Sequence, residues 1–204
     1  MRRHLLAAVA HLSDRDPVLR PVIDAVGECT LRPRRDRFEM LAGSILSQQI
    51  STAAARTIRN RLVERAGGRL AAEALLALSD EELRACGVSA QKAVYLRDLS
   101  SRVASGSLPM NRLGRLPDEE VIERLTVVKG VGRWTGQMFL MFALGRPDVL
   151  PHDDLGIRNA IRRLYGFSAM PTRAEMDRVA EPWRPYATVA CWYLWRSLEG
   201  PATG

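Results

Sequence analysis

The apolar residues of this sequence recur every three or four positions, the spacing that places them on one face of an α-helix. Such faces are formed by Phe38, Leu41 and Ile45, by Ala54, Ile58 and Leu62, by Ala93, Leu96 and Leu99, by Ile157, Ile161 and Leu164, and near the N-terminus by Leu5, Leu6, Val9 and Leu12. No segment alternates between apolar and polar positions as a strand does, and no internal repeat is present. The pattern predicts an all-α protein.

Residues at the ends of these segments predict where the helices begin and end. Ser51 is suited to cap the helix that follows it, and Asp80 begins a short helix that Gly87 ends. Pro117 starts another helix after a break in the pattern. The last helix is expected from about Pro185 to Leu198, an unusually aromatic segment.

Two glycines interrupt the helical pattern at Gly130-Val131-Gly132. A Gly-x-Gly turn can reach positive φ and bring its N–H groups close to a partner, and the N-terminus of the next helix adds partial positive charge at the same place. The turn can therefore hold a phosphate. The alternative is a tight connection between two helices of an all-α protein.

Charge favours the first interpretation. The chain has 204 residues, 47% of them hydrophobic, enough for a substantial core, and its formal net charge is +7. A basic protein of this kind has nucleic acid as its first expected partner and a membrane surface as the second.

Cysteine, histidine and the N-terminal residues exclude several classes of site. The three cysteines, Cys29, Cys86 and Cys191, are widely spaced, so we expect neither disulfides nor a thiolate metal cluster. Three histidines without a helical pair make a catalytic zinc site hard to assemble. The N-terminal apolar run is too interrupted for a secretory signal, and no segment is long enough to span a membrane. We expect a protein of the cytoplasm, the nucleoid or the nucleus.

Four segments together resemble the helix–hairpin–helix DNA glycosylase superfamily, and within it the AlkA/Mag-type 3-methyladenine DNA glycosylases II. They are Leu46-Ser47-Gln48-Gln49-Ile50-Ser51, Val128-Lys129-Gly130-Val131-Gly132-Arg133-Trp134-Thr135, Asp153-Asp154-Leu155-Gly156-Ile157, and the segment from Pro182-Trp183-Arg184-Pro185-Tyr186-Ala187 to Trp192-Tyr193. The resemblance covers roughly residues 36 to 198. It implies the form that lacks the additional N-terminal α/β domain of AlkA.

The resemblance also implies a domain organisation. One helical lobe would comprise residues 37–150 and contain the hairpin at about 125–136. The second lobe would combine residues 1–36 with 151–204 and carry the catalytic aspartate. The damaged base would enter a central cleft between the two lobes, and we expect the protein to be a monomer.

The family's catalytic aspartate maps to Asp154. The alternative for an aspartate at this place is an ordinary N-cap, and the two roles are compatible, because a carboxylate that accepts helix N–H bonds stays ionised. Asp153 is the second candidate for the catalytic role, but we expect it to be a cap.

The position of Trp134 implies the reaction type, since lyase-type members of the superfamily have a nucleophilic lysine there. Trp134 and Trp192 match aromatic positions of the AlkA base pocket, where stacking favours a positively charged alkylated purine. Met138 falls where AlkA has a tyrosine, so the pocket wall differs. For each tryptophan the alternative is packing in the core.

The remaining implied contacts are with damaged double-stranded DNA. Lys129, Gly130, Val131, Gly132 and Thr135 would bind the DNA backbone. Gln49 would be the wedge that fills the gap left by the flipped base, together with Ile50, although Gln49 could instead be a helix-capping residue. No catalytic metal and no required cofactor are expected, and the hairpin carbonyls could hold a monovalent cation.

Together these features predict a monofunctional DNA glycosylase of base excision repair. It would flip alkylated purines such as 3-methyladenine and 7-methylguanine and hydrolyse their N-glycosidic bond. Two alternatives stay open, a bifunctional glycosylase with AP lyase activity and a helix–hairpin–helix module that binds DNA without catalysis.

Overall fold

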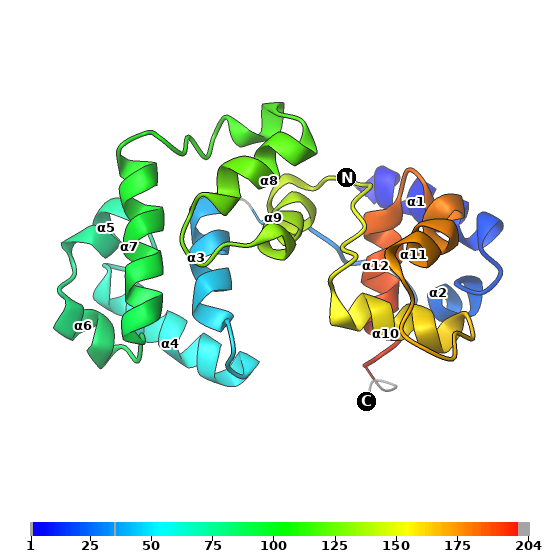
Figure 1. Cartoon of the computed structure of the whole chain (residues 1–204), viewed down its shortest axis with the longest axis horizontal. Coiled ribbons are helices and arrows are strands. Elements are labelled where there is room, and N and C mark those ends of the chain that lie inside the picture. Colours follow the sequence, from blue (N-terminus) through cyan, green and yellow to red (C-terminus); the bar gives the residue numbers. More distant parts are fainter. Residues whose placement is uncertain (1, 35, 200–204) are drawn as a thin grey trace. The chain divides into compact units, whose positions relative to one another are not determined.

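The computed structural model describes residues 2–34 and 36–199, and every regular element within them is a helix (Figure 1). The all-α class predicted from the apolar spacing is therefore confirmed. The described residues form two compact units, one of residues 34–144 and one of residues 2–33 with 145–199. No helix in these residues is both long and apolar enough to cross a membrane.

The boundaries between the units differ from those predicted. We expected the central lobe to span 37–150, but its last residue is Leu144. The segment after Leu144 belongs to the other unit because Thr188 holds it. The Thr188 hydroxyl donates to the carbonyl of Arg146 at 2.7 Å and accepts from the N–H of Val149 at 3.0 Å. Sequence periodicity does not reveal such contacts between distant segments.

The unit of residues 34–144 contains both helices of the predicted hairpin. Its elements are α3 (Arg37–Ser47), α4 (Thr52–Arg65), α5 (Ala72–Ala77), α6 (Asp80–Ala85), α7 (Ala90–Ala104), the 3-10 turn η1 (Leu113–Arg115), α8 (Asp118–Thr126), α9 (Arg133–Phe139) and the π-helical turn η2 (Leu140–Leu144). In Figure 1, α3 lies among α4, α7 and α9, all of which it contacts. Leu41, Ala42 and Ile45 of α3 are completely buried at the centre of this core.

The second unit is built around its last helix. Its elements are α1 (Arg2–Arg15), α2 (Arg20–Val26), α10 (Leu155–Leu164), α11 (Arg173–Ala180), the 3-10 turn η3 (Glu181–Trp183) and α12 (Ala187–Arg196). Helix α12 contacts α1, α2 and α10. Its residues from Ala187 to Leu194 are all buried, because a helix enclosed on all sides has no polar face to expose.

Side-chain caps fix where many of the helices begin. Ser51 accepts a hydrogen bond from the N–H of Ala54, so the predicted cap of α4 is confirmed. Helix α6 begins at Asp80, as predicted. Its cap is the preceding residue, Ser79, which forms a reciprocal capping box with Glu82.

A buried carboxylate ties the second unit together at the end of α1. Asp16 is 3% exposed and accepts four hydrogen bonds. The N–H groups of Val18 and Leu19 donate to Oδ1, while the hydroxyl of Tyr165 and the indole of Trp183 donate to Oδ2. Burial raises the pKa of Tyr165, and the Asp16 carboxylate raises it further. This hydroxyl therefore stays protonated and remains a donor.

Three predicted helical faces or ends need correction. In α1, Ala8 and Leu12 are buried, but Leu6 is 57% exposed. In α4, only Leu62 of the predicted face is buried, whereas Ile58 is half-buried and Ala54 is exposed. The last helix ends at Arg196, shorter than expected, and the π-helical turn after α9 was not predicted.

Candidate active site and DNA-binding elements

The predicted hairpin connects α8 to α9 and ends at Gly132, which is the N-cap residue of α9. Gly130 has φ = 79°, whereas Gly132 has φ = −98° and an extended backbone. Only Gly130 therefore needs the conformational freedom of glycine. A Cβ atom on Gly130 would also overlap the ring of Tyr95 on α7, so no larger residue fits there.

Two further contacts hold the hairpin in place. The Asp98 carboxylate on α7 accepts a hydrogen bond from the N–H of Lys129 at 2.9 Å, and Arg102 donates to the same carboxylate oxygen at 2.9 Å. The side-chain amide of Gln48 donates to the carbonyl of Gly130 at 2.8 Å. Partial burial alone would raise the pKa of Asp98, but the bonds from Arg102 and Lys129 outweigh it, and the pKa is lowered.

The residues after the hairpin have different exposures. Trp134 is 42% exposed, which makes its ring accessible and argues against the alternative of core packing for this residue. Met138, one turn further along α9, is buried. Thr135 is also buried, so its side chain is not on the surface; its N–H lies in the first turn of α9, where helix N–H groups lack partners within the helix. A backbone contact from Thr135 would use that group.

The predicted wedge residues lie in the loop between α3 and α4. Gln49 is exposed and has φ = 58°, a left-handed conformation that is unusual for a residue other than glycine. Ile50 is 37% exposed. Gln48 is the C-cap of α3 and Ser51 is the N-cap of α4, so Gln49 is the cap residue of neither helix. Its left-handed backbone is, however, common directly after a C-cap, so the wedge role of Gln49 stays a prediction.

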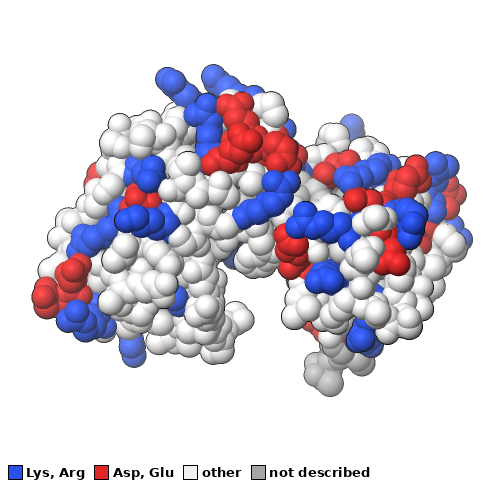
Figure 2. Space-filling view, viewed as in Figure 1, with Lys and Arg blue, Asp and Glu red and all other residues white. Residues whose placement is uncertain are grey.

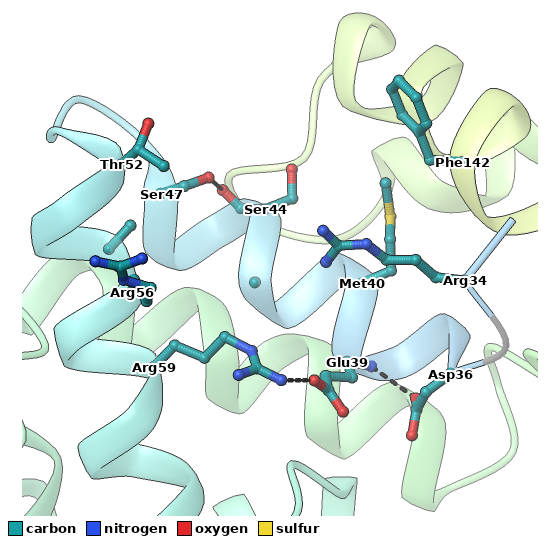
Figure 3. A pocket seen from close by; sticks show the side chains of 12 residues that line it. Arg34, Asp36, Glu39, Met40, Ser44, Ser47, Thr52, Arg56, Arg59 and Phe142 are labelled. Carbon is teal, nitrogen blue, oxygen red and sulfur yellow. Dashed lines mark hydrogen bonds and ion pairs between the residues drawn. The ribbon is translucent and has the colours of Figure 1, made fainter. Parts of the chain in front are cut away.

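A groove of about 870 Å³ opens between α3 and α4 next to this loop (Figure 3). Ser44, Ser47, Thr52 and Arg56 line the end of it that lies nearest the loop. Within residues 34 and 36–144, no acidic side chain forms an ion pair with Arg56. This end of the groove consequently carries uncompensated positive charge.

Elsewhere in that groove several polar and charged side chains have partners. Arg59 forms an ion pair with Glu39, and Asp36 accepts the N–H of Glu39 as the cap of α3 (Figure 3). On the face drawn in Figure 2, basic side chains also lie beside acidic ones in several places. Arg133 of the hairpin, for example, donates two hydrogen bonds to Glu119, at 2.8 and 2.6 Å. Among the described residues of this unit, Arg56 has no such acidic partner.

The candidate catalytic residue, Asp154, lies in the second unit at the start of α10. It is 7% exposed, and it caps the helix by accepting the N–H of Ile157 at 2.8 Å on Oδ1. The indole N–H of Trp195 on α12 donates to the same oxygen at 3.0 Å. Asp154 is therefore a buried carboxylate that is fixed by donors from two helices.

Asp153 and Asp154 have different partners and different exposures. Asp153 is exposed and pairs with Arg173, and it does not cap α10, so the expectation that it would be the cap is wrong. The helix begins at Leu155, and the cap must be the residue directly before it.

Cys191 is not a candidate nucleophile. Burial raises the pKa of its thiol, and the charge of Asp154 raises it further, so the thiol remains protonated.

Trp192 also lies in the second unit, on α12. It is 8% exposed, its ring packs edge-on against Tyr193 at 4.9 Å between centroids, and the Arg196 guanidinium lies 5.1 Å from its ring centroid. Packing in the core accounts for this environment. That Trp192 and Trp134 line one base pocket stays a prediction, since the two residues belong to different units.

Within each unit the structure brings some of the predicted residues together. It joins the wedge loop to the hairpin through Gln48, and it places Asp154 against Trp195. Gln48, Asp98 and Trp195 were not predicted as site residues. Their role depends on contacts between segments far apart in the sequence, and a single sequence carries no signal for such contacts.

Comparisons with known proteins agree with this geometry. Residues 42–185 match the model of the HhH-GPD superfamily, described as base excision DNA repair proteins. The chain belongs to this superfamily. Among curated HhH-GPD relatives, DNA-3-methyladenine glycosylase 1 of Schizosaccharomyces pombe is 38% identical over 203 residues, which cover 96% of this chain and 88% of the relative.

Two solved structures of this superfamily are also similar over most of the chain. A DNA-3-methyladenine glycosidase from Bacillus halodurans superposes with a TM-score of 0.84 at 38% identity, covering 95% of this chain and 89% of the other. Schizosaccharomyces pombe Mag1 in complex with abasic DNA superposes with a TM-score of 0.83 at 37% identity, covering 95% and 97%. The helix–hairpin–helix DNA glycosylase fold predicted from the four segments is thereby confirmed.

Proposed function

We propose that this protein is a monofunctional DNA glycosylase that removes alkylated purines from double-stranded DNA. The observation that carries the proposal is its similarity, over nearly the whole chain, to a relative named DNA-3-methyladenine glycosylase 1. A second support is that the structure of Mag1, which is similar at 37% identity, is of a complex with abasic DNA, the product of base removal. The buried carboxylate of Asp154 supports the enzyme over the non-catalytic binding module.

The chemistry assigned to Asp154 follows from its environment. In the proposed reaction the bond between C1′ and the purine nitrogen breaks, and its electron pair leaves with the base, which neutralises the positive charge of an alkylated purine. The sugar becomes oxocarbenium-like, and the ionised carboxylate stabilises that charge. Water then adds to C1′ and loses a proton, leaving an abasic site. The two N–H donors hold the Asp154 carboxylate in place for this role.

Trp134 supports water over lysine as the nucleophile. Its exposed ring stands where the resemblance places the nucleophilic lysine of lyase-type members. We propose that this ring stacks on the flipped, positively charged base, because an aromatic face attracts a cation. Trp192 and Met138 would complete the pocket. Borohydride trapping on damaged DNA tests the reaction type, and a trapped covalent adduct would overturn the monofunctional assignment.

DNA binding would begin at the hairpin. The N–H groups around Gly130 to Thr135 and the side chain of Lys129 would hold the phosphates of one strand. Gln49 and Ile50 would enter the duplex where the base leaves it. Since Arg56 lies beside that loop and forms no ion pair with the described residues of its unit, we include it among the backbone contacts.

A monovalent cation at the hairpin is part of the proposal. The oxygens it would use are main-chain carbonyls, each with two lone pairs. The carbonyls of Val128 and Gly130 already accept one hydrogen bond each, from the N–H of Val131 and from Gln48, which leaves one lone pair on each. Binding of abasic DNA should therefore be tighter in K⁺ or Na⁺ than in a bulky organic cation at equal ionic strength.

The decisive experiment compares wild type with Asp154→Asn. Both are incubated with alkylated DNA, and released 3-methyladenine and 7-methylguanine are measured. We expect release by the wild type and a loss of at least a hundredfold in Asp154→Asn, with abasic DNA still bound. Equal release by both proteins would remove Asp154 from the mechanism. DNA binding without release from any damaged duplex would favour the binding module.

A further inference from the structure

We propose that Trp195 is a positioning residue for Asp154 and that Gly156 is required for their contact. The inference rests on the proposed function, because it takes Asp154 to be the catalytic carboxylate. Neither Trp195 nor Gly156 needs to touch DNA for this role. Each acts through the orientation of Asp154.

The contact is specific in its atoms. Trp195 Nε1 lies 3.0 Å from Asp154 Oδ1, and the N–H of Ile157 lies 2.8 Å from the same oxygen. The two donors come from different helices, α12 and α10, so rotation of the carboxylate breaks both bonds at once. The cap alone would fix Asp154 relative to α10 only, whereas Trp195 fixes it relative to the core of the unit.

Gly156 makes room for this arrangement. A Cβ atom on Gly156 would lie 3.0 Å from Trp195 Cδ1, 3.1 Å from Asp154 Oδ1 and 3.2 Å from Trp195 Nε1. These distances are shorter than ordinary contacts of a methyl group, so an alanine would press on both partners of the hydrogen bond. Gly156 lies within α10, where alanine is the better helix former. Its glycine therefore serves the contact at some cost to the helix.

The indole suits a positioning role because of its chemistry. An indole N–H only donates, and it does not exchange a proton with the carboxylate in the neutral pH range. Trp195 can therefore hold Asp154 in one orientation without taking part in proton transfer. Orientation matters because a charge placed in advance against the developing cation needs no rearrangement during the reaction.

The same unit contains a matched control. Trp183 Nε1 donates to Asp16 Oδ2 at 2.6 Å, another indole bound to a buried carboxylate. Asp16 also binds Tyr165 and two main-chain N–H groups, and it serves the core. Replacing Trp183 by Phe removes the same kind of bond away from Asp154. Comparing the two variants therefore distinguishes the general effect of losing an indole donor from the specific effect of losing the donor to Asp154.

The test uses Trp195→Phe, Gly156→Ala and Trp183→Phe in the full chain. For each variant we would measure the single-turnover rate constant for release of 7-methylguanine, the Kd for an abasic duplex and the melting temperature. Trp195→Phe keeps a ring against Gly156 but lacks the N–H. We expect its rate constant to fall at least tenfold, because the lost bond is to a charged group, and its Kd to change less than twofold.

Gly156→Ala should show the same selective loss without a lower melting temperature. Trp183→Phe should melt at a lower temperature yet keep a rate constant within twofold of wild type while it is folded. The proposal is overturned if Trp195→Phe retains the wild-type rate constant. It is also overturned if Trp195→Phe and Trp183→Phe lose rate in the same proportion as stability.

A second measurement keeps the inference separate from the proposed function. The indole N–H signals are recorded by ¹⁵N–¹H NMR and assigned with the two Trp→Phe variants. In Asp154→Asn the Trp195 signal should move and the Trp183 signal should not. An unmoved Trp195 signal overturns the contact whether or not the protein removes bases. Failure of wild type to release any base, with the Trp195 signal moving as expected, overturns the proposed function instead.

Discussion

The side-chain amide of Gln48 and the main-chain carbonyl of Gly130 are joined by a hydrogen bond of 2.8 Å between residues 82 positions apart. Gln48 directly precedes the predicted wedge, and Gly130 forms the turn of the hairpin. The bond therefore fixes the loop that would enter the duplex relative to the turn that would hold the phosphates. Positions of these two elements cannot vary independently.

Replacing Gln48 by Ala tests this coupling. A hydrogen bond of this kind contributes about 1 kcal/mol, so we expect the Kd for an abasic duplex to rise about fivefold. Gln91→Ala is the matched control, because the Gln91 amide is bonded to the Tyr95 hydroxyl and not to the hairpin. Fluorescence anisotropy with labelled duplex measures both. Equal Kd values for Gln48→Ala and wild type would contradict the coupling.

Gly130 should tolerate no substitution. Alanine there meets two obstacles, a left-handed backbone at φ = 79° and overlap with the ring of Tyr95. We expect Gly130→Ala to lose about 2 kcal/mol or more of unfolding free energy, measured with urea, together with most of its DNA affinity. Gly106 offers the comparison, since it has a similar φ of 76° but nothing within 4 Å of a Cβ, and its alanine variant should lose only about 1 kcal/mol. Equal losses of unfolding free energy in the two variants would show that the Tyr95 ring moves aside and that its overlap with the Cβ atom costs little.

The sequence predicts features that depend on neighbouring residues better than features that depend on packing. Helices depend on neighbours three and four positions apart, so spacing located most of them, and Ser51 was recognisable as a cap. The short helices α2, α5 and α11 were not predicted. Faces were less predictable. Ala54 looked like part of an apolar stripe, but it is exposed, because the spacing of apolar residues does not show which turns of a helix another element covers.

The same difference separates the site residues that were predicted from those that were not. Asp154 was found because a short motif surrounds it, and the hairpin because glycines mark its turn. Trp195 lies 41 positions from Asp154, and their contact exists only because α10 packs against α12. Asp98 and Lys129 are 31 positions apart, and their hydrogen bond likewise exists only because α7 packs against the hairpin. Such partners are products of the tertiary fold and leave no local pattern.

The hairpin should be less stable in acid because of Asp98. Its pKa is lowered in the folded protein, where the bonds from Arg102 and the N–H of Lys129 outweigh the opposing effect of burial. A carboxyl with a lower pKa when folded stabilises the fold above its unfolded value, about 3.9, and loses that contribution as the pH falls through the folded value. Wild type should therefore exceed Asp98→Asn in unfolding free energy at pH 7, and the difference should shrink below about pH 4. A difference that stays constant from pH 7 to pH 3 would argue against this role.

Asp16 should contribute more to stability than any exposed carboxylate. Asp16→Asn would place an amide N–H₂ among four donors, leaving at least one of them buried without an acceptor. We expect a loss of about 3 kcal/mol in urea unfolding. Asp14→Asn, two residues earlier on the exposed side of α1, should change stability by less than about 0.5 kcal/mol. Similar losses from both variants would mean that the Asp16 network adds little.

Arg56 provides a test of the DNA-binding face that does not depend on catalysis. A side chain that neutralises one phosphate adds about 0.9 to the slope of log Kd against log salt concentration. We expect Arg56→Gln to lower this slope by about one for an abasic duplex. Arg61→Gln makes the same charge change on the same helix, but Arg61 borders a different pocket, with Glu64, Glu81 and Glu82. Its slope should match wild type. If both variants lower the slope equally, the positive charge of α4 acts as a whole, and the groove beside the wedge loop is not a specific contact.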